Sequence, residues 1–63
     1  MDVGKRMLNY RATHNLSRRE LAELMGEKKH IIDWCETGIH KPHLAKQIRL
    51  ENKMKKLEEA DNV

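Results

Sequence analysis

The side chains best suited to bind another molecule are concentrated between positions 28 and 37. Five of them can donate a hydrogen bond, accept one or stack on a flat ligand: Lys28, Lys29, His30, Asp33 and Trp34. If this segment is a helix, the two lysines stand at its amino end, where the helix dipole disfavours a cation. That placement makes sense if the amino end points into an anionic surface, as a recognition helix does in the DNA major groove. A solvated pair of charges is the alternative.

Trp34 is expected on the outer face of the same helix, because Ile32 and Cys35 mark its inward face. It is the only Trp of the chain, and its burial would stabilise a small core more than almost any other side chain would. An outward position therefore needs a reason, and large apolar groups at a surface tend to mark interaction sites. Three alternatives stay open: Trp34 contacts DNA, contacts a partner subunit, or folds over the preceding helix as a core residue.

Neither a catalytic centre nor a metal site is expected in this chain. One cysteine, Cys35, excludes an internal disulfide, and the four histidines lack the regular spacing of metal ligands. Cys35 is expected to face the core, whereas three histidines lie on a polar face or in a loop: His30, His40 and His43. We therefore expect no enzymatic activity and no cofactor.

The length and charge of the chain limit its fold and its partners. Sixty-three residues suffice for one small domain with a thin core, expected to cover residues 1–63. The net charge is +3, and positions 1–49 hold ten Lys and Arg against six Asp and Glu, so an anionic partner is expected there. No apolar run is as long as a membrane span and no export leader opens the chain, so we expect a cytoplasmic protein without membrane contact.

The spacing of apolar residues predicts an all-α fold, a small bundle of four or five helices that contains a helix-turn-helix and ends in an extended helix. Four helices are expected, over residues 3–13, 18–25, 28–37 and 42–60. Asp2 can cap the first helix, and Asn15 can end it in a left-handed conformation. Ser17 and Glu20 form a capping box for the second helix, and Gly26 supplies the tight turn that ends it.

A charged residue lies within the apolar arc of the first helix. Arg11 stands there between the directions of its apolar neighbours, so it needs a partner or must be expelled from the core. Glu36, next to the inward Cys35, is the expected partner, and this ion pair would tie the first helix to the third. The alternative is that the long Arg11 side chain extends to water.

A set of spaced residues extends without a gap from position 4 to about position 44. It consists of Gly4-Lys5-Arg6, Arg11, Leu16-Ser17-x-x-Glu20-Leu21-Ala22-x-x-Met25-Gly26, Ile32, Glu36-x-Gly38 and Lys41-Pro42-x-Leu44. In this order and spacing the chain resembles the Cro and phage-repressor family of helix-turn-helix proteins, also called Xre-like. Glu27 and Lys28 differ from the apolar residue and the Ser that are usual in the family's turn. Gln47 and Glu51 stand where the family has apolar residues.

The resemblance implies that residues 28–37 form a recognition helix, and it implies the same structural ion pair between Arg11 and Glu36. The expected base-reading face consists of Lys28, Lys29, His30, Asp33 and Trp34. Phosphate contacts are expected from Lys5, Arg18, Thr37, Lys41 and His43. Among these, Arg18 takes the place of a family Gln that contacts phosphate at the start of the second helix.

The expected function is therefore that of a sequence-specific regulator of transcription that binds double-stranded DNA. The resemblance favours a small Cro-like repressor of a phage or mobile element, which acts by occupying its operator. The alternative is a protein-interaction module on the same scaffold, such as an antirepressor that binds another regulator.

The last helix is expected to join two copies of the chain into a homodimer. Leu44 and Ile48 are expected to extend a core formed by residues 2–49, which leaves a second apolar stripe without cover in residues 50–63. That stripe is the expected dimer interface: Leu50, Met54 and Leu57. A dimer would place two recognition helices one turn of DNA apart and require an operator with two-fold symmetric half-sites. The alternative is that the stripe folds back onto the first helix, using Leu8.

Overall fold

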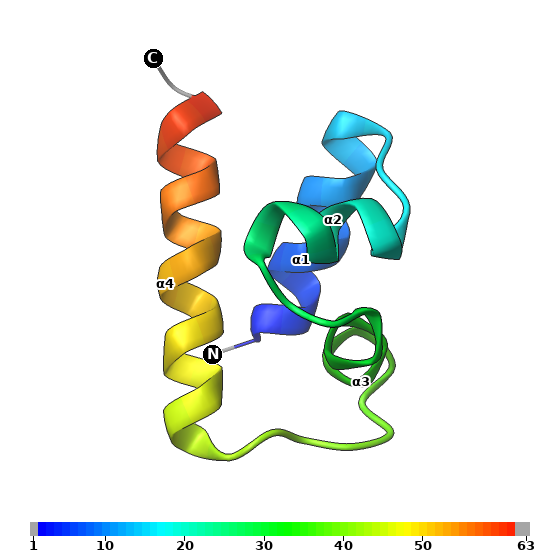
Figure 1. Ribbon diagram of the computed structural model, residues 1–63, viewed down its shortest axis with the longest axis vertical. Coiled ribbons are helices and arrows are strands. Elements are labelled where there is room, and N and C mark those ends of the chain that lie inside the picture. Colours follow the sequence, from blue (N-terminus) through cyan, green and yellow to red (C-terminus); the bar gives the residue numbers. More distant parts are fainter. Residues whose placement is uncertain (1, 62–63) are drawn as a thin grey trace.

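The computed structural model describes residues 2–61, and Figure 1 shows them as four α-helices, with no strand in this range. The helices are α1 (Val3–His14), α2 (Arg18–Met25), α3 (Lys29–Thr37) and α4 (Leu44–Asp61). The all-helical class predicted from the sequence is confirmed. The domain expected over residues 1–63 also includes positions 1, 62 and 63, which lie outside the described residues.

The helix ends depend on local capping residues, and the structure has the caps that the sequence predicts. The Asp2 carboxylate accepts a hydrogen bond of 3.1 Å from the Lys5 backbone N–H. Asn15 ends α1 with a φ of 54°, in the left-handed region, and Ser17 and Glu20 form both bonds of the capping box. Two helices begin later than expected, because Lys28 is the N-cap of α3 and α4 starts at Leu44 rather than at residue 42.

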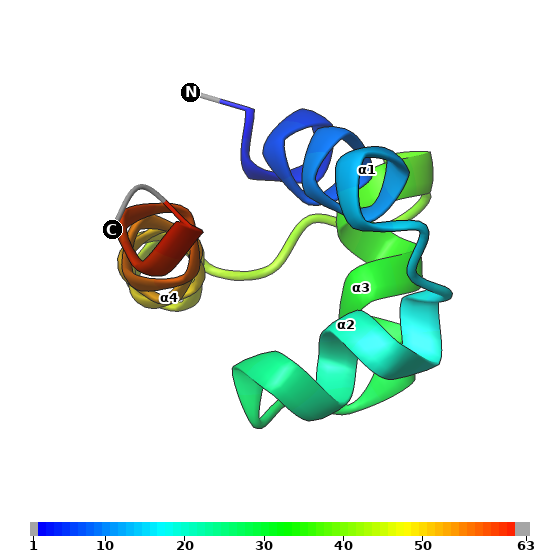
Figure 2. The same cartoon turned by 90° about the horizontal axis from the view of Figure 1, so that it is seen from above.

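The core is built from residues of all four helices, and α4 packs against α1 and α2. Figure 2 shows α1, α2 and α3 grouped together, with α4 standing beside them and nearly end-on in this view. Eight hydrophobic side chains are buried there: Val3, Met7, Leu21, Ala22, Met25, Ile32, Leu50 and Met54. They come from all four helices, so α4 is a part of the domain rather than an appendage to it.

The two apolar stripes of α4 have exchanged the places expected of them. Leu50 and Met54 are fully buried, and Leu57 packs against the same core, so the chain itself covers the expected dimer interface. Leu44 and Ile48, expected to extend the core, are 71% and 49% exposed. Only one face of a straight helix can lie against α1, and the stripe with more apolar volume occupies it. The stripe thus folds back onto its own domain, although Leu8, expected to receive it, is itself exposed.

Ion pairs fix α4 at both of its edges. On one edge, the Arg6 guanidinium of α1 pairs with Glu51 at 3.1 Å and also with Glu58. On the other edge, Glu27 accepts hydrogen bonds from Lys46 and Lys53, and its side chain is only 7% exposed. Burial by itself would raise the pKa of Glu27, but the bonds from the two lysines outweigh it and hold the pKa below its ordinary value.

The polar residues of α4 that interrupt the apolar pattern are accounted for by these contacts. Glu51, one of the two residues of α4 that stand where apolar residues were expected, is buried against Arg6. The other is Gln47, whose amide donates a hydrogen bond of 2.7 Å to the Pro42 carbonyl and so fastens the loop before α4. Each therefore has a partner that lies elsewhere in the chain or in the preceding loop.

α1 and α3 cross at very close range. A Cβ placed on Gly4 would lie 1.9 Å from the carbonyl oxygen of Cys35 and 2.6 Å from its carbonyl carbon. Both atoms belong to backbone, so a glycine is required at this crossing. Further along the same two helices, the Arg11 Nη2 lies 2.5 Å from the Glu36 carboxylate, which is the ion pair expected from the sequence.

Within residues 2–61, no helix combines the length and the apolar character that crossing a bilayer requires.

Candidate nucleic-acid interface

α3 is held on one side and open on the other. A glycine turn joins it to α2: Gly26 has a φ of 69°, and the next backbone N–H, that of Glu27, donates to the Ala22 carbonyl at 2.9 Å. α3 then packs against both α1 and α2 and buries Ile32 completely. Since only this face is buried, the opposite face of α3 is available to another molecule.

The amino end of α3 presents three exposed side chains in sequence, Lys28, Lys29 and His30. No side chain caps this end by a hydrogen bond, so no local cap satisfies the backbone N–H groups of the first turn. The Lys29 ammonium lies 2.9 Å from the carboxylate of Asp33, one turn later. That hydrogen bond is the main cause that lowers the pKa of Asp33, which is therefore a carboxylate at neutral pH.

Trp34 belongs to the surface rather than to the core. Its ring lies between two imidazoles, with centroid distances of 4.7 Å to His30 and 4.5 Å to His40, and both pairs are edge-on. The core alternative for Trp34 is thus wrong, because the buried cluster does not include it and its neighbours are surface histidines. The three rings form an aromatic row along the outer side of α3, and such flat surfaces can stack on bases or pack on sugars.

A chain of alternating charges crosses the start of α2 and the middle of α3. The Glu36 carboxylate is 2% exposed and receives hydrogen bonds from Arg11, at 2.8 and 2.5 Å, and from Arg18, at 3.2 Å. Arg18 also reaches Asp33 at 3.4 Å, and Asp33 binds Lys29. The hydrogen bonds that Arg11 donates to Glu36 raise the pKa of Arg11 above its ordinary value. Three cations thus share two carboxylates, which leaves this network with one excess positive charge.

The residues expected to contact phosphate fall into two groups. Arg18 and Thr37 are engaged within the domain: Arg18 through the charge network, and Thr37 through a 2.6 Å bond from its hydroxyl to the Asp33 carbonyl. Lys5, Lys41 and His43 are exposed and form no ion pair with any residue between 2 and 60.

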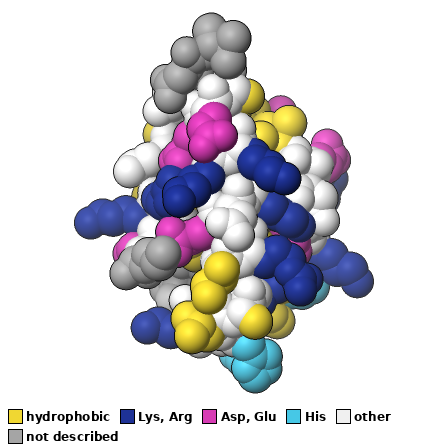
Figure 3. All heavy atoms as spheres, turned by 90° about the vertical axis from the view of Figure 1, so that its left-hand side faces the viewer, with side chains coloured by type: hydrophobic (Ala, Val, Ile, Leu, Met, Phe, Trp, Pro, Cys, Tyr) yellow, Lys and Arg dark blue, Asp and Glu magenta, His cyan; other side chains and the backbone are white. Residues whose placement is uncertain are grey.

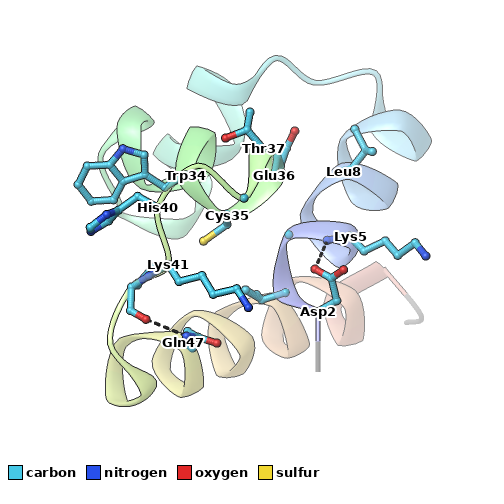
Figure 4. Close-up of a pocket in the computed structure, with 14 residues that line it drawn as sticks. Asp2, Lys5, Leu8, Trp34, Cys35, Glu36, Thr37, His40, Lys41 and Gln47 are labelled. Carbon is cyan, nitrogen blue, oxygen red and sulfur yellow. Dashed lines mark hydrogen bonds between the residues drawn. The ribbon is translucent and has the colours of Figure 1, made fainter.

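Lys5 and Lys41 lie at one cavity of about 430 Å³ between α1, the end of α3 and the loop before α4. Figure 4 shows Trp34 against His40 on one side of this cavity and Lys5 on the other, with the Lys41 side chain extending from the loop toward the start of α1. Lys5 and Lys41 are 36 positions apart in the sequence. The fold nevertheless brings both cations to the cavity that Trp34 and His40 of the aromatic row also line.

Cys35 lies in the wall of the same cavity and also packs against the core, so it is half-buried rather than fully inward as expected. Burial raises the pKa of its thiol, which keeps the sulfur protonated and unreactive at neutral pH. Across the part of the chain that the structure describes, no three His, Cys, Asp or Glu side chains converge in a group that could hold a metal ion.

Two features of the site were not visible to sequence reasoning. His40 completes the aromatic row, but it lies in an irregular loop whose path no periodicity predicts. Glu27, a departure in the turn, is the anchor for α4, and its partners are 19 and 26 positions further along the chain. The loop between α3 and α4 determines how close the start of α4 comes to Glu27. No residue pattern near Glu27 indicates this contact.

Compared with known protein families, curated protein sequences and solved structures, the chain gives no significant match.

Proposed function

We propose that this protein binds double-stranded DNA in a sequence-specific manner and regulates transcription. The observation that carries the proposal is the open face of α3: two lysines and a histidine exposed at the amino end of a helix whose other side is fixed by α1 and α2. A helix inserted by its amino end into the major groove presents donors of this kind to base edges and phosphates. In this proposal α2, the glycine turn and α3 act as a helix-turn-helix.

The charges around α3 support this orientation. Arg19 at the start of α2, Lys28 before α3 and Lys41 after it are exposed and make no ion pair with another described residue. They stand before and after the reading face, where a duplex has its phosphates. Arg18 adds a further contact only by sharing its guanidinium between a phosphate and its two carboxylate partners, which orient it.

Residue roles follow from this arrangement. Lys28, Lys29 and His30 would reach base edges, and Trp34 would pack on a sugar or a thymine methyl beside them. Asp33 would position Lys29 and, as an acceptor, pair with the amino group of a cytosine. We extend the proposal to a Cro-like repressor, small enough to act by operator occupancy alone, with two copies of the chain on two-fold symmetric half-sites.

A second candidate function is binding of another regulatory protein, as an antirepressor does. It is favoured by one observation: the charge network holds Arg18 of α2 and Lys29 of α3 on carboxylates, so part of the cationic surface around α3 is already neutralised. A protein surface would accept this mixture of charges together with the partly exposed Trp34 more readily than a row of phosphates would.

Selection of binding duplexes from a random DNA pool, followed by fluorescence anisotropy on the selected site, separates the two functions. Lys29→Ala should cost about 1–3 kcal/mol on the selected duplex and much less on unrelated DNA. Lys55→Ala, on the exposed part of α4, is the matched control and should change neither affinity. The dissociation constant should rise steeply with salt, because each neutralised phosphate releases counterions. Failure to enrich any sequence, with weak and salt-insensitive binding, would reject the DNA proposal.

A further inference from the structure

The outer face of α4 carries apolar and cationic side chains together. Leu44 and Ile48 are one helical turn apart and largely exposed, and Arg49 and Lys56 follow on the adjacent strip, two turns from one another. Figure 3, which views the molecule from the α4 side, shows hydrophobic side chains gathered at one end of this face and a column of Lys and Arg beside them. We call these four residues the α4 ridge.

The α4 ridge has no counterpart within its own domain. Lys46 and Lys53, the other cations along this edge of the helix, are held by Glu27, whereas Arg49 and Lys56 form no ion pair with any of residues 2–60. An exposed apolar pair with unpaired cations beside it fits a partner that offers apolar groups and carboxylates side by side. A DNA backbone offers negative charge but no apolar surface of that kind.

A surface of that complementary kind exists on the same chain. Four residues of α2 and of the turn before it line a shallow hollow of about 290 Å³: Leu16, Glu20, Glu23 and Leu24. Leu24 is 53% exposed, and Glu23 is exposed and pairs with no cation in the described range. The Ser17 backbone N–H lowers the pKa of Glu20, so this second carboxylate is also charged at neutral pH. We call this surface the α2 hollow.

We infer that the α4 ridge of one copy of this chain docks in the α2 hollow of a second copy. Leu44 and Ile48 meet Leu16 and Leu24 in this contact, while the ridge cations meet the hollow carboxylates. Two-fold symmetry makes the contact twice, since each copy provides one ridge and one hollow, and so closes the assembly at a dimer. Two apolar contacts and two sets of opposite charges then share one interface.

This interface replaces the one expected from the sequence, whose residues are buried within the domain. The inference deepens the proposed function, on which it rests for the two-copy complex on DNA. Its test is run without DNA, so that it and the proposed function can fail separately.

Reversing one charge on each surface and measuring dimerisation by sedimentation velocity tests this contact. Glu23→Lys makes the hollow repel the ridge, and Lys56→Glu makes the ridge repel the hollow, so each variant alone should dimerise about tenfold more weakly than the parent. In an equimolar mixture of the two, each altered surface meets an opposite charge at one contact and the parental pair forms at the other. The mixture should therefore recover the mass of the parent dimer. Lys5→Glu, on α1, makes the same change of net charge and should leave the dimer intact.

The parent should sediment near its chain mass of 7.5 kDa when dilute and approach twice that mass at about 100 µM in low salt. Ile48→Ser should also weaken the dimer while the helical circular dichroism stays unchanged, because Ile48 is outside the core. A parent that stays at the monomer mass at this concentration overturns the inference. So does a mixture of Glu23→Lys and Lys56→Glu that is no more associated than either variant alone, or a Lys5→Glu variant weakened as much as Lys56→Glu.

Discussion

Replacement of Gly4 by alanine tests the close crossing of α1 and α3. The added methyl carbon would lie 1.9 Å from the Cys35 carbonyl oxygen, whereas real contacts of this kind are not shorter than 3.0 Å. Removing the overlap requires the two helices to separate by about 1 Å, because a backbone carbonyl cannot rotate aside as a flexible side chain would. The shift would disturb the buried residues next to Gly4 in α1, Val3 and Met7.

The sign of the effect distinguishes the structure from local propensity. Helix propensity alone predicts that Gly4→Ala stabilises the protein by about 0.5–1 kcal/mol. Overpacking at a site of this kind costs about 1–3 kcal/mol, and contact with backbone places Gly4 at the upper end of that range. We therefore expect a net loss of about 2 kcal/mol, which corresponds to a fall in Tm of about 8–16 °C for a domain of this size.

Thermal melts followed by far-ultraviolet circular dichroism measure this difference. Asn9→Ala, at an exposed position of the same helix, is the matched control and should change the Tm by no more than a few degrees. A Gly4→Ala protein that melts at or above the temperature of the parent would show that α1 and α3 do not cross at the distance described.

Three further outcomes are expected. Glu27→Gln should lower the free energy of unfolding by about 1–2 kcal/mol at pH 7 by releasing α4. Because folding lowers the pKa of Glu27, this carboxylate stabilises the protein above its unfolded pKa and loses that effect as the pH falls through the folded value, so urea titrations of parent and variant should begin to converge once the pH falls below the ordinary glutamate pKa of about 4.3. Glu36→Ala should cost about 3–5 kcal/mol in the same assay by leaving Arg11 unpaired, and a loss below 1 kcal/mol would contradict the buried pair. Cys35 should react with a thiol reagent far more slowly in the native protein than in urea, since burial raises the pKa of the thiol, and equal rates would contradict this.

The helix ends could be predicted because each depends on a few neighbouring residues. Asn15, Gly26 and the capping box of Ser17 and Glu20 satisfy backbone groups within their own turn, so no tertiary information is needed. The ion pair between Arg11 and Glu36 could be predicted for a related reason: a cation in an apolar arc requires a carboxylate, and few acidic residues are placed to supply one.

The orientation of α4 could not be predicted in the same way. Its apolar residues form two stripes, and the expectation that Leu44 and Ile48 join the core was wrong, because the structure buries Leu50 and Met54 instead. The choice is made by the loop that precedes α4 and by ion pairs at positions far apart in the sequence, such as Glu27 with Lys53. The candidate site also has a predictable and an unpredictable part. The exposed amino end of α3 could be predicted from helix periodicity, whereas the contact of Trp34 with His40 depends on the path of the loop.

The central claim is that the open face of α3 binds DNA, and a chemical-shift map of the labelled protein tests it most directly. On addition of a selected duplex, the largest changes in backbone amide shift should fall at the amino end of α3, at Trp34 and in the loop around Lys41. Smaller changes are expected along the α4 ridge as two copies of the chain assemble on the duplex. Changes concentrated on α4, or a map without saturable changes at Lys28, Lys29 and His30, would contradict the account.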